Sequence, residues 1–243
     1  MANTKEVRKQ IASIKSTQKI TSAMEMVAAS KMKRTQDLMM VGRPYSNKIQ
    51  EVISHIATSN SEHSHPFYED RTVKKACFIV VSTDKGLCGG LNINLFKSIV
   101  AKAAEFKTNG IDSSFALIGL KASAFFQSVG GEVVATADKL GDQPNPEDLI
   151  GLTKVVLDLH KNQDVDEVYL CSNRFVNTMT QTPRLEQLLP LEPDADSGLA
   201  HHWDYIYEPD ARDLLDRLLI RYIESQVYQG VVENKACEQA ARM

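Results

Sequence analysis

The segment Ser82–Phe96, "STDKGLCGGLNINLF", has the residue types of a phosphate-binding turn, because three glycines stand between an apolar run and a helix-like segment. Backbone N–H groups at such strand-to-helix turns bind phosphate oxygens. However, Gly86, Gly89 and Gly90 do not form G-x-G-x-x-G, and no Lys-Ser/Thr pair follows Gly90 as in a P-loop. The acidic residue that would hold a ribose is also missing after the next apolar run, Ser114–Gly119. We therefore predict a structural turn whose backbone conformation requires glycine, and we keep nucleotide binding as the weaker alternative.

The cysteine and histidine residues show no metal-binding pattern. The four cysteines lie far apart and contain no C-x-x-C pair: Cys77, Cys88, Cys171 and Cys237. We predict reduced thiols rather than a zinc site or a disulfide framework. His63/His65 and His201/His202 form two close pairs, but no cysteine or carboxylate cluster accompanies them, so we expect solvated loop residues.

Catalytic side chains are equally hard to find. Ser82, Asp84 and His160 do not form the G-x-S-x-G elbow that exposes a nucleophilic serine. No pair of carboxylates stands in a setting that would raise a pKa. The sequence predicts no catalytic residue, no cofactor and no metal.

Positive charge is concentrated near the N-terminus. Residues 1–40 contain eight Lys and Arg against three Asp and Glu, whereas the whole chain has a formal net charge of −3. This distribution favours an acidic partner at that segment. The alternative, which the charges alone favour equally, is that these side chains form a solvent-exposed helix face without a partner. Because no aromatic residue precedes Tyr45, we do not predict nucleic-acid binding.

The first fifty-odd residues predict one long amphipathic helix. Apolar residues recur at alternating spacings of three and four: Val7, Ile11, Ile14, Ile20, Met24, Val27, Ala28, Met32, Leu38 and Met39. Thr4 could cap its start, and Pro44 interrupts the pattern, which resumes at Ile49. A helix of about 50 residues is roughly 75 Å long, so it needs a second long helix or a partner to cover its apolar stripe.

The C-terminal segment supplies a second helix. From Pro209 onward, apolar and small residues follow a heptad track, with Asp210 as the predicted N-cap and Gly230 inside the pattern. The track contains Ala211, Leu215, Leu218, Tyr222, Ser225, Gln229, Val232, Ala236 and Met243. We expect the two terminal helices to pair as an antiparallel coiled coil. Two ordinary amphipathic helices packed on the middle of the chain are the alternative.

The middle of the chain alternates between strand and helix patterns. Strands are predicted at Ala76–Ser82, Ser114–Gly119, Glu132–Ala137, Val165–Asn173 and Met179–Leu189, the last at a sheet edge because of Pro183. Helices are predicted at Asn92–Lys107, Lys121–Ser128 and from Asn145 or Pro146 to Lys161, with a loop at Glu192–Gly198. This order predicts an α/β fold with a Rossmann-like, mostly parallel sheet. The predicted domains are 1–58 and 207–243 for the paired helices and 70–200 for the α/β domain.

Three segments carry a resemblance to a known family. "IASIKSTQKITSAMEMVAASKMKRTQ" at Ile11–Gln36 resembles the N-terminal helix of the gamma subunit of the F-type ATP synthase, in its bacterial form. "STDKGLCGGLNINLF" resembles that family's signature after the first strand, and "ENKACEQAARM" at Glu233–Met243 resembles part of its C-terminal helix. In one respect the sequence departs from the family pattern: we expect a C-terminal helix shorter than is usual for the family.

The resemblance implies a non-catalytic rotor shaft that couples proton-driven rotation of a membrane ring to conformational cycling of catalytic beta subunits. The implied partners are the alpha, beta and epsilon subunits and the ring of c subunits, with no nucleic acid and no small-molecule substrate. A nucleotide- or dinucleotide-binding α/β domain with helical arms is the alternative function.

The resemblance also implies contact residues on the N-terminal helix: Arg8, Lys9, Lys19, Met24, Lys31, Lys33 and Arg34. The sequence contains no run of about 18 apolar residues, so we predict no membrane-spanning helix. We also recognise no secretory signal at the N-terminus. We therefore expect a peripheral location on the cytoplasmic face of a bacterial inner membrane. We also expect residues 1–14 to pack less well within this chain than Met24–Met39.

Overall fold

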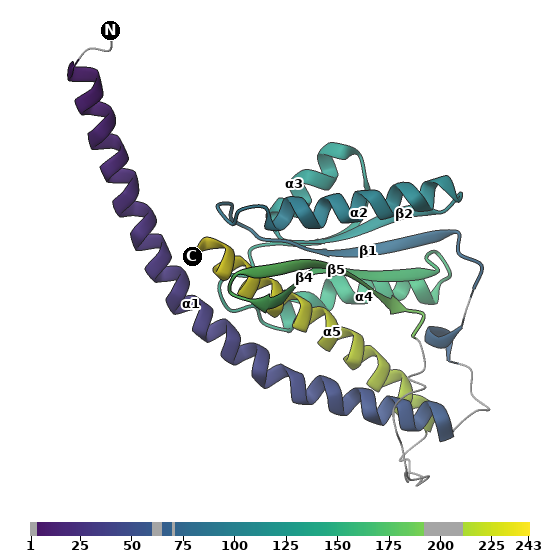
Figure 1. The fold of residues 1–243 in the computed structure, drawn as a ribbon. Coiled ribbons are helices and arrows are strands. Elements are labelled where there is room, and N and C mark those ends of the chain that lie inside the picture. The colour runs from purple at the N-terminus through teal and green to yellow at the C-terminus, as the bar shows by residue number, and fades with distance from the viewer. Residues whose placement is uncertain (1–3, 60–64, 70, 192–210) are drawn as a thin grey trace.

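The computed structural model describes residues 4–59, 65–69, 71–191 and 211–243. Figure 1 shows a long helix at each end of the chain and a compact α/β body between them. The helices are α1 (Thr4–Ser59), α2 (Leu91–Thr108), α3 (Leu120–Val129), α4 (Glu147–Lys161) and α5 (Ala211–Arg242), with a 3-10 turn η1 (Pro66–Tyr68). The strands are β1 (Lys75–Val81), β2 (Asp112–Ile118), β3 (Glu132–Ala137), β4 (Glu167–Asn177) and β5 (Thr180–Leu189).

The five strands form one sheet in the order β3-β2-β1-β4-β5. β1 pairs in parallel with β2 and with β4, and β2 pairs in parallel with β3. β5 alone is antiparallel and lies at the edge beside β4, where Pro183 removes no interior ladder bond. The α/β fold with a mostly parallel sheet, predicted from the alternating pattern, is confirmed.

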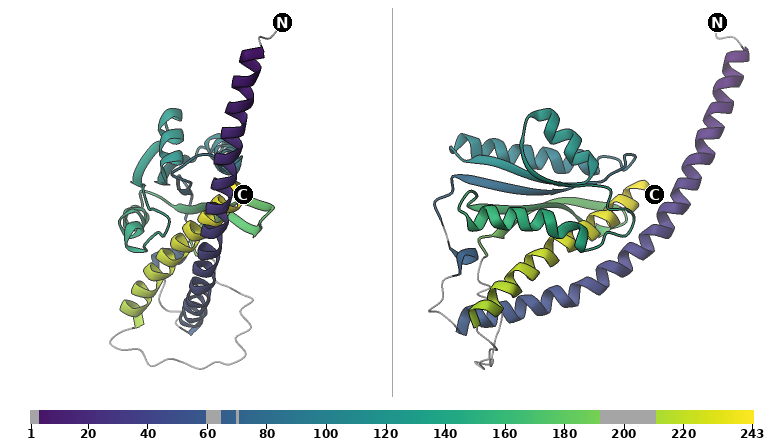
Figure 2. Two further views of the ribbon diagram at one scale, coloured as in Figure 1. Left: turned by 90° about the vertical axis from the view of Figure 1, so that its left-hand side faces the viewer. Right: turned by 180° about the vertical axis from the view of Figure 1, so that it is seen from behind.

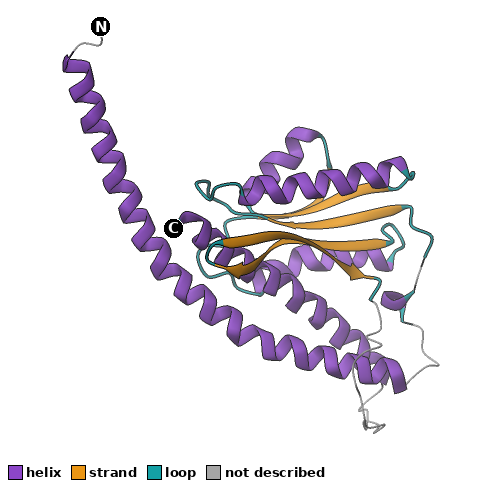
Figure 3. Cartoon of the chain, viewed as in Figure 1, coloured by secondary structure: helices purple, strands orange, loops and turns teal. Residues whose placement is uncertain are grey.

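Helices cover both faces of the sheet, as Figure 3 shows. On one face, α2 and α3 pack against Phe78, Phe115 and Leu117. On the other face, α4 and α5 pack against Ile79 and Leu170. Because both faces are covered, the central strand β1 is buried along Ala76–Val81 and reads as an unbroken apolar run.

The terminal helices run antiparallel, and α5 lies between α1 and the sheet (Figures 1 and 2). Met32 and Met39 of α1 pack with Val232, Ala236 and Ala240 of α5 in one buried cluster. The predicted pairing of the two terminal helices is therefore confirmed. The N-terminal part of α1 continues beyond the end of α5 and projects away from the body in both figures.

The buried face of α5 differs from the predicted heptad track in its first half. Leu219, Ile223 and Val227 are the fully buried positions there, whereas Leu218 and Tyr222 of the predicted track are only partly buried. The physical reason is that α5 packs on the α/β core as well as on α1, so its first half presents an apolar face to two neighbours. The predicted N-cap Asp210 and the loop at Glu192–Gly198 lie outside the described residues.

Candidate functional site

The glycine-rich segment forms a hydrogen-bonded turn after β1. Ser82 Oγ donates to Ile118 O at 3.0 Å and accepts from the Ala122 N–H at 2.8 Å. The Asn92 side chain closes the turn from α2, because its Oδ1 accepts from Thr83 N and its Nδ2 donates to Thr83 Oγ1 at 2.8 Å. The polar side chains of this turn are therefore used in holding the β1, β2 and α2 ends together.

Asp84 has a structural use as well. Its Oδ1 accepts from the backbone N–H of Leu120 at 3.1 Å, at the start of α3, and from the N–H of Lys139 at 3.3 Å, after β3. One carboxylate thus connects three loops at the carboxyl ends of neighbouring strands. Because Asp84 Oδ1 accepts two backbone N–H bonds, we assign this carboxylate a structural role rather than that of a general base.

Only part of the turn needs glycine. Gly89 has φ +56°, which is the left-handed region that favours glycine. A Cβ on Gly90, the N-cap of α2, would stand 3.2 Å from Asn94 Nδ2. The prediction is therefore right for Gly89, but Leu87 adopts the same left-handed conformation, with φ +59°, without being glycine.

The crevice at the carboxyl ends of β1 and β4 is the place where open α/β sheets bind nucleotides, because the strand order reverses there. In this chain the crevice is filled by α5. Asn173, which lies in β4 just beyond the part paired with β1, donates through Nδ2 to Asn234 Oδ1 at 2.9 Å, and Cys237 Sγ donates to Asn173 O at 3.3 Å. Cys237 also packs against Cys88 of the glycine-rich turn. A helix of the same chain therefore occupies the space in which a nucleotide would bind.

The thiols of Cys237 on α5 and of Cys77 on β1 are buried. Burial raises the pKa of the Cys237 thiol well above its usual range, and burial raises the pKa of Cys77 to about 11. Both thiols are therefore protonated at neutral pH and behave as small apolar side chains.

A charged group anchors the last turns of α5. Glu238, whose side chain is 5% exposed, lies 2.5 Å from Arg242 Nη2 and 3.6 Å from Lys235 Nζ. Arg242 also donates to Gly86 O at 3.4 Å, so the end of α5 contacts the glycine-rich turn directly. A buried carboxylate needs such partners, because an uncompensated charge in this position is strongly destabilising.

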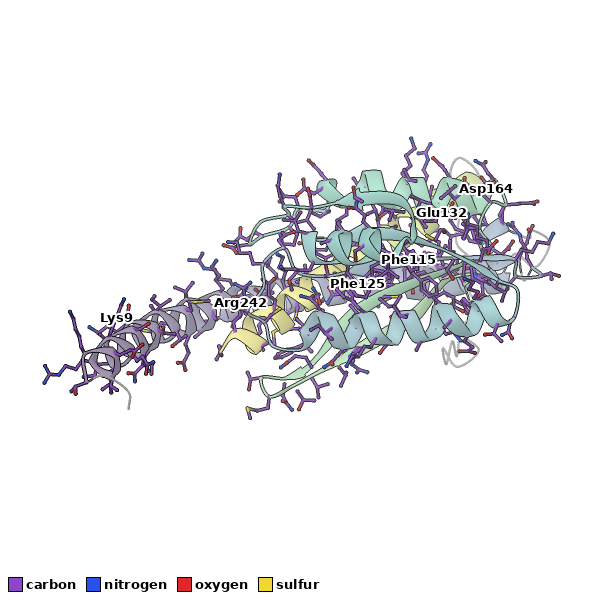
Figure 4. The ribbon with its side chains drawn as sticks, turned by 90° about the horizontal axis from the view of Figure 1, so that it is seen from above. Lys9, Phe115, Phe125, Glu132, Asp164 and Arg242 are labelled. Atoms are coloured by element: carbon purple, nitrogen blue, oxygen red, sulfur yellow. The ribbon has the colours of Figure 1, made fainter. Side chains whose placement is uncertain are left out.

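The structure separates the seven predicted contact residues into two groups. Arg8, Lys9 and Lys19 are exposed on the projecting part of α1, and Lys33 and Arg34 are exposed where α1 runs beside α5. Figure 4 shows Lys9 far from the body and Arg242 close to α1.

The other two residues contact the rest of the chain. Met24 is half-buried and lines a groove of about 330 Å³ with Gln239 and Arg242 of α5. Lys31 Nζ lies 2.6 Å from Asp142 Oδ2, which follows β3. The hydrogen bond from Lys31 holds the pKa of Asp142 below its usual range.

The histidine prediction needs one correction. His65 is buried rather than solvated: its Nδ1 accepts from Phe67 N at 3.1 Å and its Nε2 lies 2.5 Å from Asp216 Oδ1 on α5. Because Nδ1 is an acceptor here, Nε2 carries the proton and donates to the carboxylate. The contact fixes the segment before β1 against α5. His63, His201 and His202 lie outside the described residues.

Sequence reasoning missed the partners of Lys31, His65 and Asp84, because each partner is distant in the chain. The Lys235–Glu238–Arg242 group was detectable, since spacings of three and then four residues (i, i+3, i+7) place the three side chains on one helix face. Within the described residues, no helix is long and apolar enough to span a membrane.

The fold of this chain is similar to that of chains in solved ATP synthase structures. A chain in the central stalk and c-ring structure of the Tetrahymena thermophila mitochondrial ATP synthase has a TM-score of 0.67 and 23% identity, covering 92% of this chain and 96% of that one. A chain in the rotor structure of the Euglena gracilis mitochondrial ATP synthase has a TM-score of 0.49 and 14% identity, with 91% and 88% coverage. The first similarity shows a shared fold.

A model of the ATP synthase family matches residues 3–243, which is nearly the whole chain. The matched range contains both terminal helices and the α/β body between them. The chain belongs to the ATP synthase gamma-subunit family, whose members form the central rotor shaft of that enzyme.

Proposed function

We propose that this chain couples proton-driven rotation of a c-ring to conformational cycling of the catalytic beta subunits, and contributes no catalytic group of its own. It works as a peripheral subunit on the cytoplasmic face of a bacterial inner membrane. The observation that carries the proposal is the projecting part of α1, which leaves Val7, Ile11 and Ile14 exposed beside Arg8 and Lys9. An exposed apolar stripe flanked by cations is the surface that a surrounding ring of subunits would cover.

The proposed mechanism is differential contact. A shaft shifts a beta subunit toward one conformation only if it contacts that conformation more favourably than the others. The projecting part of α1 is suited to this, because its apolar and basic residues give it distinct faces. Exposed ion pairs contribute roughly 0–1 kcal/mol each, so Arg8, Lys9, Lys19, Lys33 and Arg34 can favour one orientation without locking the shaft.

Torque reaches this surface through the contacts of α5. The α5 helix is held to the sheet by Asn234 and Cys237, and it packs on α1 through Val232, Ala236 and Ala240. We assign the epsilon subunit and the c-ring to the α/β body and the alpha and beta subunits to the projecting helix. The division into domains at 1–58, 70–200 and 207–243 follows the same reasoning.

Reconstitution with purified alpha and beta subunits tests the proposal. We expect the chain to join their ring and to change its ATPase rate. The double variant Arg8→Glu/Lys9→Glu should alter that rate, whereas Lys107→Glu, at an exposed position of α2, should leave it unchanged. A chain that neither joins the ring nor alters its ATPase rate overturns the proposal.

A further inference from the structure

An apolar groove lies on the face of the α/β body that α5 does not cover. It has a volume of about 810 Å³ and runs between α2, α3 and the glycine-rich turn. We call it the α2–α3 groove and define it by six of its lining residues: Leu87, Ile93, Lys97, Val100, Lys121 and Phe125. Leu87 is 78% exposed and Ile93 is 58% exposed. Large apolar side chains gathered at this level of exposure mark an interaction surface.

The groove has cations on opposite walls. Lys97 comes from the middle of α2, and Lys121 comes from the first turn of α3, near the glycine-rich turn. None of the residues that line the groove is acidic. The complementary ligand therefore has an apolar centre with negative charge on both sides.

The length of the groove fits a short helix. Its α2 wall extends from Asn92 to Ala104, and twelve residues of helix rise about 18 Å. Three turns of a partner helix span that distance, with apolar residues at i, i+3, i+4 and i+7 filling the groove. A fatty acid or a similar amphiphile has one anionic end and therefore complements only one of the two walls.

We propose that the α2–α3 groove docks an amphipathic helix of a partner subunit, with carboxylates on both flanks of its apolar stripe. The proposal rests on the proposed function in one respect: the partner is a subunit of the same rotary enzyme. The docked helix contacts the turn that carries Cys88 and Gly86, which in turn contact Cys237 and Arg242 of α5. Docking there restricts motion between the α/β body and the terminal helices α1 and α5.

Site-specific photo-crosslinking in the purified, fully assembled enzyme tests the proposal. A photoreactive residue at Ile93 should crosslink to one helical segment of another subunit that carries Asp or Glu on both flanks of an apolar stripe. The matched control is Val129, an exposed residue of α3 that does not line the groove. It should not crosslink to that segment. Crosslinks from Ile93 to lipid, to a segment without acidic flanks, or to no subunit overturn the proposal.

Charge reversal at the two lysines of the groove provides a second test of the proposal. With the photoreactive residue at Ile93, Lys97→Glu/Lys121→Glu should lower the crosslink yield about tenfold or prevent the folded chain from retaining its partner, because both flanking ion pairs become repulsive. Lys107→Glu, at the far end of α2, should leave the yield unchanged. An unchanged yield in the double variant overturns the proposal. If the enzyme assembles and hydrolyses ATP normally while Ile93 crosslinks to nothing, the groove proposal fails and the shaft function stands.

Discussion

At the scale of single residues, the pair Lys31–Asp142 links α1 to the α/β body. The two charged atoms lie 2.6 Å apart, but both side chains are partly exposed. Solvent screening therefore limits the contribution of the pair to about 1 kcal/mol or less. The contact of Lys31 with a partner subunit stays a prediction, whereas its contact with Asp142 lies within the chain.

The pair predicts a pH-dependent contribution to stability. Because the hydrogen bond from Lys31 lowers the folded-state pKa of Asp142, the contribution is fully present above the unfolded pKa of about 4 and is lost as the pH falls through the folded pKa. A double-mutant cycle of Lys31→Met and Asp142→Asn, measured by urea unfolding at pH 7 and pH 3, should give a smaller coupling energy at pH 3 than at pH 7. Equal coupling at both values contradicts the assignment.

His160 predicts a second pH effect. Its ring is fully buried against Phe67, and burial together with the nearby Arg71 cation lowers its pKa to about 4 from a usual 6.5. The unfolded chain therefore binds a proton between these values while the folded chain does not, so stability decreases as the pH falls from 6.5 to 4. The loss is at most about 3 kcal/mol.

The variant His160→Leu isolates this effect. Its free energy of unfolding, followed by urea titration across the same pH range, should lack the slope that His160 contributes. Parallel curves for the variant and the parent chain would contradict the assignment of the slope to His160.

At the scale of elements, Gly230 permits the close packing of α5 on the sheet. A Cβ at this position would lie 3.1 Å from Leu170 Cδ2. Gly230→Val should therefore destabilise the chain by about 1–3 kcal/mol, because the larger side chain overpacks the interface between α5 and β4. Thermal or urea unfolding measures the change.

Gly151 on α4 provides the matched control for this substitution. It is exposed, and a Cβ there meets nothing within 4 Å. Gly151→Ala should stabilise the chain by about 0.5–1 kcal/mol through helix propensity alone. If Gly230→Val had the same effect as Gly151→Ala, the close contact with Leu170 would be of no energetic consequence.

The two halves of α1 should differ in their local stability. In the isolated chain, the segment Thr4–Ile14 is exposed and projects beyond the end of α5, whereas Met32 and Met39 are buried against α5. We expect hydrogen exchange to be much faster in the first segment, because it opens without loss of buried contacts. Equal protection of the two segments would show that α1 does not depend on α5.

Much of the fold was predictable from hydrophobic periodicity. The bounds of β3, Glu132–Ala137, match the prediction, and α4 begins one residue after Pro146. These elements are local, so their patterns carry the necessary information. The position of α5 over the strand ends was not predictable, because it depends on contacts such as Asn173–Asn234 that join residues 61 apart in the chain.

The candidate site was predictable only in outline. The motif spacing predicted a structural turn at Ser82–Phe96, but it could not identify Ile118 and Lys139 as hydrogen-bond partners of Ser82 and Asp84. The contact roles of Arg8, Lys9 and Lys19 remain predictions, since they depend on subunits outside this chain.

At the scale of the whole molecule, the chain is a long, curved helical rod with a body attached to one side (Figure 2). The rod is double where α5 accompanies α1 and single where α1 projects. Such a shape can transmit rotation only if the body, α5 and α1 move together. Asn234 and Cys237 hold α5 to the sheet, and Val232, Ala236 and Ala240 pack it against α1, so these contacts provide that coupling.

Direct observation of rotation tests this account most directly. Alpha and beta subunits are fixed to a surface with this chain at their centre, and a bead is attached through Lys107→Cys at the exposed end of α2. The account predicts that addition of ATP turns the bead continuously in one direction. A bead that stays still, or diffuses without a preferred direction, while the same complexes hydrolyse ATP would contradict the assignment of this chain as the shaft.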